Sequence, residues 1–303
     1  MDRKKNKVVA VVGATASGKT AYAVEFAKKY NGEIISADSR LVYRGMNIGT
    51  AKPTVEEMQG IPHYMIDIAE PEFNYSAGLY AKQAKTHIYE ILSKGKIPVV
   101  AGGTGLYFRI LLENYDLPDT EPDYNLRKEL SELSYEELFF MLSELDAEAA
   151  NSVEKNDRKK LIRYIEIVKQ SGCPLSKARG LKECEFDVEW TGLNFPREEL
   201  YDRINKRVDL MLERGLVEET KYLLKKHGRI PNITDTIGYK EITAYLDGVL
   251  TLEEAKDKLK QNTRNYAKRQ LTWFRKNENI KWNCYPEKKK KEDSFFLFFF
   301  YIS

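Results

Sequence analysis

Residues 8–20 of the chain read VVAVVGATASGKT. The first five are apolar and mostly β-branched, which is typical of a strand buried on both faces of a parallel sheet. The other eight, Gly13 to Thr20, fit the pattern G-x-x-x-x-G-K-[ST], and the stretch from Gly18 to Tyr30 has the pattern of a helix. A strand, a glycine-rich loop and a helix in this order predict a loop that binds phosphate groups.

The predicted loop combines three ways of holding an anion. Its glycines let backbone N–H groups turn inward, and the N-terminus of the following helix adds its dipole. Lys19 supplies a positive charge, and the hydroxyl of Thr20 suits Mg²⁺. The motif does not decide whether a phosphoryl group is transferred or a diphosphate leaves. We expect the phosphates to be held by Gly13, Thr15, Ala16, Ser17, Gly18, Lys19 and Thr20.

Two further strands are predicted, and both end in residues suited to a site. Glu33 to Ala37 ends at Asp38, and Ile97 to Ala101 ends in the loop Gly102-Gly103-Thr104-Gly105. Because ligands of parallel sheets bind outside the carboxyl ends of the strands, Asp38 and Thr104 should lie on the edge that carries the phosphate loop. At such a position Asp38 suits three roles: Mg²⁺ ligand, general base or helix cap.

The pattern changes at residues 118–122, which resemble a linker, and the chain then reads as wholly helical to about residue 180. A strand-like segment at 188–195 returns the chain to the sheet, and helices follow at 197–214, 216–226 and 252–276. We therefore predict an α/β fold. Residues 1–118 and 191–303 form a P-loop NTPase-like core with a parallel sheet and basic C-terminal helices, and residues 119–190 form an all-helical insertion domain.

Composition excludes several other classes of protein. The chain has 303 residues, 42% apolar and 31% charged, with a formal net charge of +3, which suits a soluble globular protein. Three cysteines without a C-x-x-C pair do not suit a disulfide scaffold or a zinc finger. The apolar run at 295–302 is too short to cross a bilayer, and suits either a docked strand or a tail. We expect a cytoplasmic monomer without a membrane role.

The near-neutral total charge hides two unlike parts. Residues 255–291 carry 13 Lys and Arg against three acidic residues, which is a net charge of +10 and leaves −7 for the rest of the chain. Tyr266, Trp273 and Phe274 interleave with these cations. Basic residues mixed with aromatic ones favour a surface that follows a nucleic-acid backbone, although a solvated charged helix has the same composition.

The order of several motifs resembles the family of tRNA dimethylallyltransferases, also called tRNA isopentenyltransferases. The resemblance runs from about Lys7 to Trp282. The segments that carry it are Gly13 to Thr20, Ala37 to Arg44, Asn47 to Pro53, Ile61 to His63, Tyr75 to Ala77, Gly102 to Tyr107, Asn156 to Glu166, Ile237 to Lys240 and Lys268 to Arg275.

The resemblance implies a reaction. The family transfers a dimethylallyl group from dimethylallyl diphosphate to N6 of the adenosine just 3′ of the anticodon, in tRNAs that read codons beginning with U. It requires Mg²⁺, and diphosphate is the leaving group. The partners implied are therefore dimethylallyl diphosphate and a tRNA anticodon stem-loop. The competing functions are an adenylate isopentenyltransferase, a small-molecule kinase and a non-catalytic RNA-binding protein.

The resemblance also implies roles for single residues. Asp38, Thr104 and Arg207 carry over as catalytic residues: a carboxylate for the adenine amine, a hydroxyl near the bridging oxygen and the tRNA, and a cation for the leaving group. Many family members have Arg at the position of Lys160, and Lys lacks its bidentate geometry. The residues implied to contact tRNA are Asp38, Ser39, Arg40, Leu41, Thr104, Arg127, Lys159, Lys160, Leu161, Ile162 and Arg163.

Overall fold

The computed structural model describes residues 5–113, 123–178 and 184–283. These residues form two compact units, each with its own core. The core unit consists of residues 1–75, 83–107 and 186–303, and the helical unit consists of residues 76–82 and 108–185. The predicted linker at 118–122 and the apolar run at 295–302 lie outside the described residues.

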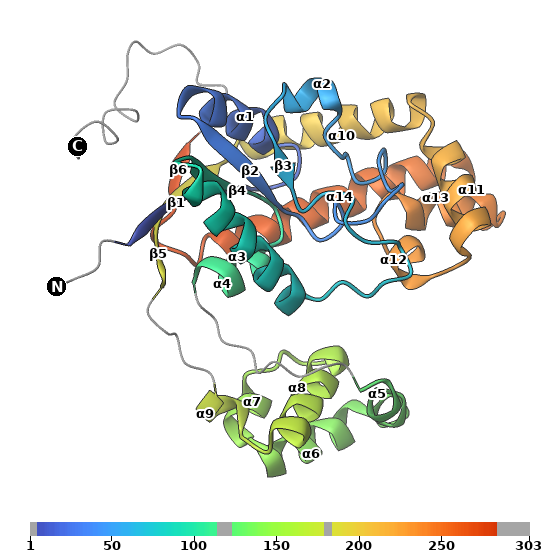
Figure 1. The fold of residues 1–303 in the computed structure, drawn as a ribbon. Helices are drawn as coiled ribbons and strands as arrows, with labels where there is room; N and C mark the ends of the chain where they lie inside the picture. Colours follow the sequence, from blue (N-terminus) through green and yellow to red (C-terminus); the bar gives the residue numbers. More distant parts are fainter. Residues whose placement is uncertain (1–4, 114–122, 179–183, 284–303) are drawn as a thin grey trace. The chain divides into compact units, whose positions relative to one another are not determined.

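The core unit is built on a sheet of six strands that all run parallel, in the order β3-β2-β4-β1-β5-β6 (Figure 1). The α/β fold class is therefore confirmed. The sheet includes two short edge strands that the sequence pattern did not predict. The strands are β1 (Asn6–Gly13), β2 (Gly32–Ala37), β3 (His63–Tyr64), β4 (Ile97–Gly102), β5 (Phe186–Leu193) and β6 (Lys281–Asn283).

Helices connect and cover these strands. Helix α1 packs against β2 and β4, and α14 packs against β1, α10 and α13. Helices α3 and α4 each contain residues of both units. The helices that lie wholly or partly in the core unit are α1 (Lys19–Lys29), α2 (Val55–Met58), α3 (Ala77–Ser93), α4 (Gly105–Leu112), α10 (Arg197–Glu213), α11 (Leu216–His227), α12 (Pro231–Thr234), α13 (Tyr239–Leu246) and α14 (Leu252–Phe274).

The register of the central strands places three loops at one level. Gly102, the last residue of β4, is paired with Val12 on one side and with Ala37 on the other. The phosphate loop, the segment after β2 and the loop after β4 therefore begin side by side. This arrangement follows from burial, because β1 and β2 are almost wholly buried and both belong in the middle of the sheet.

The boundary of the helical segment needs a correction. The sequence analysis placed it at residue 190, but β5 begins at Phe186 and is paired with β1 along its whole length, from Phe186 to Leu193. Residues 186–190 therefore belong to the sheet. Within the described residues, no helix combines the length and apolar character that crossing a membrane requires.

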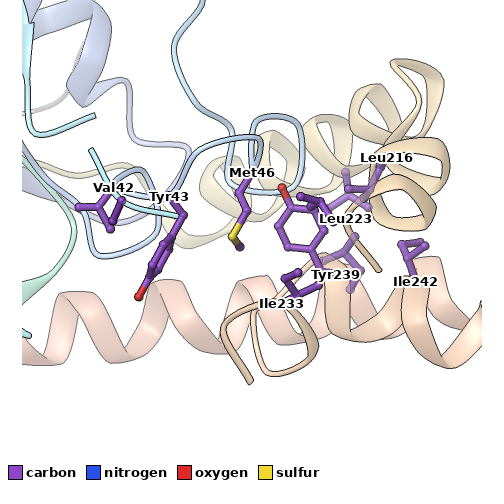
Figure 2. Close-up of a cluster of buried hydrophobic side chains, with 11 residues drawn as sticks. Val42, Tyr43, Met46, Leu216, Leu223, Ile233, Tyr239 and Ile242 are labelled. Atoms are coloured by element: carbon purple, nitrogen blue, oxygen red, sulfur yellow. The ribbon is translucent and has the colours of Figure 1, made fainter. Parts of the chain in front are cut away.

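Two of the hydrophobic clusters in the described part of the core unit show how its helices are held. One lies between the sheet and α1, and includes Val9, Val11 and Ile34 from the strands with Val24 and Phe26 from the helix. The other lies among α10, α11, α13 and the segment after β2 (Figure 2). Its labelled members in Figure 2 are Val42, Tyr43, Met46, Leu216, Leu223, Ile233, Tyr239 and Ile242.

The helical unit begins its helices at polar caps that the sequence displays. The side chains of Asp123, Ser134, Asp146 and Asp157 each accept a hydrogen bond from a backbone N–H in the first turn. Leu130, Leu138, Leu142, Leu161 and Ile165 form much of its core. The helices are α5 (Tyr124–Ser131), α6 (Tyr135–Leu145), α7 (Ala147–Asn151), α8 (Arg158–Ser171) and α9 (Leu175–Ala178).

A buried carboxylate on β2 is fully paired. Glu33 is 2% exposed, and its oxygens accept hydrogen bonds from the Tyr64 hydroxyl at 2.7 Å, Lys94 Nζ at 2.9 Å and Lys96 Nζ at 2.6 Å. Burial by itself raises the pKa of Glu33, but the hydrogen bonds from Lys96, Tyr64 and Lys94 outweigh burial and lower the pKa to about 2. The charged form of Glu33 therefore stabilises the fold.

We expect Glu33→Gln to lower the free energy of unfolding by about 2–3 kcal/mol at pH 7, because it leaves two ammonium groups beside a neutral amide. Folding lowers the pKa of Glu33 from 4.5 to about 2. The loss should therefore be complete above pH 4.5 and should shrink as the pH falls towards 2. Urea unfolding across this range measures it. Glu90 of α3, an exposed carboxylate that lies 2.8 Å from His87, provides the control, and an equal loss for Glu90→Gln would contradict the argument.

Candidate active site

The phosphate loop follows β1 with the backbone that its sequence predicts. Gly18 has φ 82°, a left-handed conformation that glycine adopts without strain, and α1 starts at the next residue. Ala16 also has a positive φ, 63°, which is uncommon for a residue with a side chain and occurs mostly at functional loops. The Ser17 hydroxyl is buried and has no hydrogen-bond partner among the described residues. The Ser17 hydroxyl can therefore form a hydrogen bond with a ligand in the loop.

Lys19 lies at the centre of the site. Its ammonium donates a hydrogen bond to the carbonyl of Ala14 at 2.5 Å. Burial and the neighbouring charge of Arg207 lower the pKa of Lys19 to about 7, although Asp38 acts in the opposite direction. An anion bound in the loop favours the charged form of Lys19, because it supplies a counter-charge.

Asp38 and Thr104 lie on neighbouring strand ends, as the sequence predicted. The Asp38 carboxylate accepts the backbone N–H of Arg40 at 2.8 Å, and the Thr104 hydroxyl accepts the backbone N–H of Ser39 at 3.0 Å. The backbone N–H of Thr104 donates to the carbonyl of Ala37 at 3.1 Å. These bonds fix the two loops to each other and leave one Asp38 oxygen outside the turn.

Helix α10 brings two arginines to the phosphate loop. Arg207 Nη1 donates to the Thr15 hydroxyl at 3.2 Å, and Arg203 Nε donates to the carbonyl of Ala16 at 3.0 Å. Arg203 also stacks over the Phe195 ring at 4.3 Å. Burial lowers the pKa of Arg207, and Glu57 and Asp38 partly offset this effect. Arg207 therefore has the position that the family resemblance implied, whereas Arg203 was not predicted.

Helix α14 contributes two site residues that the sequence analysis did not assign. The Tyr266 hydroxyl is hydrogen-bonded to the Thr104 side chain, and burial raises its pKa. The Gln270 side chain is bonded to both Thr15 and Gly103. A signal was present, because Gln270 is a polar residue on the buried face of an amphipathic helix, between Ala267 and Phe274.

One cavity of about 390 Å³ brings most of these groups together. It combines cations and hydroxyls at the phosphate loop with the Asp38 carboxylate after β2 and the Tyr266 ring on α14. Gly13, Ala16, Ser17, Gly18 and Thr104 are not part of its lining. Those predicted residues that line it are Thr15, Lys19, Thr20, Asp38, Ser39, Arg40, Leu41 and Arg207.

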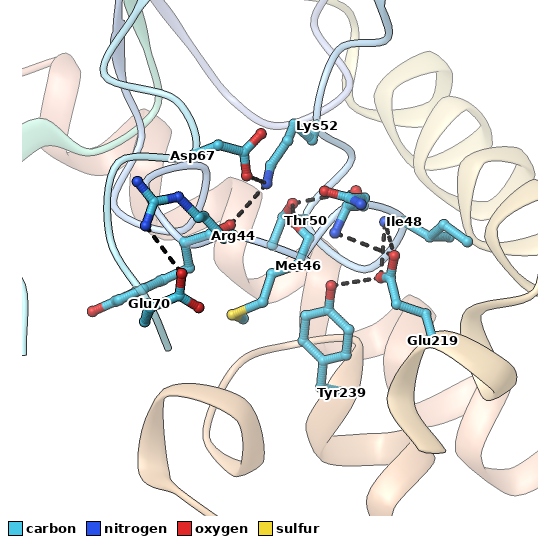
Figure 3. Close-up of polar contacts among 11 residues, drawn as sticks. Arg44, Met46, Ile48, Thr50, Lys52, Asp67, Glu70, Glu219 and Tyr239 are labelled. Atoms are coloured by element: carbon cyan, nitrogen blue, oxygen red, sulfur yellow. Dashed lines mark hydrogen bonds and ion pairs between the residues drawn. The ribbon is translucent and has the colours of Figure 1, made fainter. Parts of the chain in front are cut away.

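A loop from another part of the chain closes one side of the cavity. Residues 49–51 and Pro53 line it, and Figure 3 shows how Glu219 of α11 holds this loop. The Glu219 carboxylate accepts the backbone N–H groups of Ile48 at 2.8 Å and Gly49 at 3.0 Å, and the Tyr239 hydroxyl at 2.6 Å. Burial raises the pKa of Tyr239, so its hydroxyl stays protonated and can donate.

In the helical unit, two predicted tRNA contacts share one buried carboxylate. Arg127 donates two hydrogen bonds of 2.8 Å to the Glu166 carboxylate. Arg163 also forms an ion pair with Glu166, whose side chain is fully buried. Burial raises the pKa of Glu166, but the arginines and the backbone N–H of Asp123 outweigh it. The side chains of Arg127 and Arg163 keep 35% and 31% of their surface exposed.

The run from Lys159 to Ile162 divides between surface and core. Lys159 is exposed, and the ammonium of Lys160 lies 5.6 Å from the centre of the Tyr164 ring. Leu161 is fully buried in the core of the unit, and Ile162 packs against that core. The implied tRNA contact of Leu161 therefore needs correction, because its side chain is not accessible to RNA.

Within α14, the excess of positive charge lies in the second half of the helix. In the first half, Lys260 pairs with Asp209 at 2.7 Å and Lys256 lies 3.6 Å from the same carboxylate. From residue 264 to residue 276 the sequence has five cations and no acidic residue. Lys268 and Arg269 are exposed there, and Trp273 is 41% exposed. This half of α14 has the composition of a nucleic-acid contact.

The residues around the loop fit a diphosphate with a divalent cation. Lys19 and Arg207 offer positive charge, and the orphaned hydroxyl of Ser17 offers a hydrogen bond. Thr20 is exposed at the start of α1 and lines the same cavity as Asp38. Hydroxyl and carboxylate oxygens are the ligands that Mg²⁺ prefers.

A parallel sheet, a G-x-x-x-x-G-K-T loop at its edge and a cavity lined by cations define a phosphate-binding protein with a P-loop core. A family model described as IPP transferase matches residues 41–277. The tRNA dimethylallyltransferase of Pelotomaculum thermopropionicum is 44% identical over 288 residues, which are 93% of this chain and 91% of the relative. That of Acetivibrio thermocellus is 46% identical over 285 residues, 91% of each chain. The chain belongs to the IPP transferase family.

Solved structures agree with this membership. The full-length tRNA isopentenylpyrophosphate transferase from Bacillus halodurans is 44% identical with a TM-score of 0.70, and the match covers 92% of this chain and 90% of that one. A eukaryotic dimethylallyltransferase, described in crystallographic snapshots as acting on tRNA, is 29% identical with a TM-score of 0.79, over 89% and 70% of the two chains.

We expect Lys19 to titrate near pH 7 in the free protein, whereas exposed lysines titrate near ~10.4. Burial disfavours the charged form, so Lys19 is protonated below this pH and neutral above it. A ¹³C NMR titration of the lysine Cε signals measures the midpoint, and Lys19→Arg identifies the signal by its loss. Pyrophosphate should raise the midpoint. A midpoint above pH 9 in the free protein would contradict the argument.

Proposed function

We propose that the protein transfers a dimethylallyl group from dimethylallyl diphosphate to N6 of the adenosine just 3′ of the anticodon, in tRNAs that read codons beginning with U. The observation that carries the proposal is that Lys19, Arg207 and Asp38 line one and the same cavity. A leaving group and a nucleophile can meet there. The names of the relatives support a tRNA acceptor over a free nucleotide.

The reaction exchanges one bond for another. The C1–O bond to the diphosphate breaks, the C1–N6 bond forms, and the amine loses one proton. The allylic carbon tolerates positive charge, so much of the barrier lies in the departure of the diphosphate. Groups that stabilise the developing negative charge therefore accelerate the reaction most.

Residues of the phosphate loop and of α10 stabilise the leaving group. Lys19 and the backbone N–H groups of the loop bind the diphosphate, and Arg207, which is bonded to Thr15 of the loop, adds a second positive charge. We propose that Mg²⁺ binds with the diphosphate, with Thr20 as its ligand from the protein. The ion supplies further positive charge at the phosphate oxygens.

Asp38 and Thr104 serve the acceptor. The free oxygen of Asp38 orients the weakly nucleophilic adenine amine and accepts its proton. The Thr104 hydroxyl, which is hydrogen-bonded to Ser39 and Tyr266, lies on the same side of the cavity as Asp38. An adenine must leave its stack to enter this cavity, and the bases of a single-stranded anticodon loop unstack at low cost.

The remaining substrate contacts extend beyond the cavity, and Arg269 of α14 also lines it. We propose that the second half of α14 and the exposed cations of the helical unit, Lys159 with Arg127 and Arg163, bind tRNA phosphates. We also propose that the protein acts as a monomer.

One assay tests the function against its alternatives. The protein is incubated with labelled dimethylallyl diphosphate and Mg²⁺, and with unmodified tRNA, AMP, or ATP plus a nucleoside. We expect label on tRNA alone, and no transfer when EDTA removes the metal. Label on AMP but not on tRNA would instead identify an adenylate isopentenyltransferase, and phosphoryl transfer from ATP would identify a kinase.

We expect Asp38→Asn to reduce kcat by roughly 10²–10⁴-fold, because the amide cannot accept the N6 proton. The Kd for tRNA should change less than threefold, since the amide oxygen can still accept the N–H of Arg40. Single-turnover transfer and filter binding provide the two values. Asp257→Asn, an exposed site on α14, should leave both unchanged. Equal losses of turnover and of tRNA binding would make Asp38 a binding residue.

We expect the affinity for tRNA to fall steeply with salt, because cations on α14 displace counterions from phosphates. Lys268→Gln and Arg269→Gln should each reduce the slope of log K against log[salt] by about 1. Lys225→Gln, an exposed cation of α11, is the matched control. A slope unaffected by the α14 variants would remove this surface from the tRNA contact.

A further inference from the structure

Gln270 is a buried polar residue whose two side-chain atoms join separate parts of the site. It lies on α14 and is 5% exposed. Its Oε1 accepts the backbone N–H of Thr15 at 2.8 Å, and its Nε2 donates to the carbonyl of Gly103 at 2.9 Å. Thr15 offers only a donor and Gly103 only an acceptor at these atoms, so the orientation of the amide is determined.

The Gln270 amide completes a chain of hydrogen bonds across the cavity edge. Arg207 donates to the Thr15 hydroxyl at 3.2 Å, and Gln270 bonds Thr15 to Gly103. The next residue, Thr104, accepts the N–H of Ser39 at 3.0 Å, beside Asp38. Hydrogen bonds and short stretches of backbone therefore connect the cation of the leaving-group site to Ser39, the residue that follows Asp38.

The shape of the loop after β4 depends on this contact. A Cβ atom added to Gly103 would lie 2.2 Å from Gln270 Nε2, so only a glycine allows the amide to approach. Its neighbour Gly105 is covered in the same way by Trp273, at 2.1 Å from an added Cβ. Three consecutive residues of this loop thus take their positions from one face of α14, through Gln270, Tyr266 and Trp273.

We propose that Gln270 is a positioning residue for group transfer: it sets the distance between the phosphate loop and the Asp38–Thr104 side of the cavity. The proposal rests on the proposed function. Gln270 lines the cavity, but each of its polar ends is already bonded to the protein, so we assign it to positioning rather than to substrate binding. Its effect should therefore fall on the alignment of the reacting atoms, for which a displacement of about 1 Å can cost on the order of 10²-fold in rate.

The test is Gln270→Met, which keeps the volume and removes both hydrogen bonds. We expect kcat for tRNA prenylation to fall roughly 10- to 100-fold, while the Kd values for tRNA and pyrophosphate change less than threefold. Gln261→Met, at an exposed position of the same helix, should behave as the wild type. Thermal unfolding of each variant checks that the comparison is made between folded proteins.

Two other variants weaken the hydrogen bonds of Gln270 in different ways. Gly103→Ala pushes the amide away from its acceptor, and Gln270→Glu keeps the bond from Thr15 but sets a carboxylate against the Gly103 carbonyl. Both should lose kcat with little loss of binding, so the inference remains testable if Gln270→Met does not fold.

A kcat within twofold of the wild type in the folded variants would overturn the proposal. So would a loss of kcat matched by an equal loss of affinity for tRNA or pyrophosphate, since Gln270 would then serve only the fold or binding. Absence of transfer by the wild type and Gln261→Met is a separate result, and it refutes the proposed function itself.

Discussion

The site depends on one constraint, the parallel register that pairs Gly102 with Val12 on one side and Ala37 on the other. Because the three strands end at the same level, the loops that follow them share one edge of the sheet. This shared edge brings together the anion-binding backbone, the Asp38 carboxylate and the Thr104 hydroxyl. A shift of one residue in any of these strands would turn the side chains to the opposite face and separate the groups.

Register alone does not fix the loops, because loops after strands can bend. Two later helices provide the remaining contacts: α10 places arginines on Thr15 and Ala16, and α14 bonds to Thr15, Gly103 and Thr104. Both helices are more than 180 residues from the phosphate loop in the sequence. The site is therefore complete only after the chain has passed through the helical unit and returned to the sheet at β5.

Local patterns predicted the parts of the fold that local physics controls. The β-branched run at 8–12, the loop at 13–20 and the strand ends at Asp38 and Thr104 were all found where the sequence placed them. The strands β3 and β6 were missed, since two or three residues carry no periodicity. Their place in the sheet is decided by their neighbours, which the sequence pattern does not reveal.

The less predictable features are those that depend on distant pairing. The roles of Gln270 and Glu219 arise from partners far away in the chain, and a polar residue on a helix does not reveal its partner. The count of charges along the sequence could not reveal such pairing either. Asp209 of α10 neutralises cations in the first half of α14. Leu161 lies within a basic run but belongs to a core. The predicted roles in catalysis and tRNA binding remain predictions.

The ion pairs of Arg127 and Arg163 with Glu166 affect the entropy cost of binding a ligand. A free arginine side chain on a surface samples many rotamers, and ordering it on a ligand costs up to ~2 kcal/mol. Here the buried carboxylate already holds both guanidinium groups, so that ordering occurs when the unit folds. For the proposed contact with tRNA, the two arginines form a rigid, preorganised surface, and a phosphate that docks on it loses little affinity to side-chain ordering.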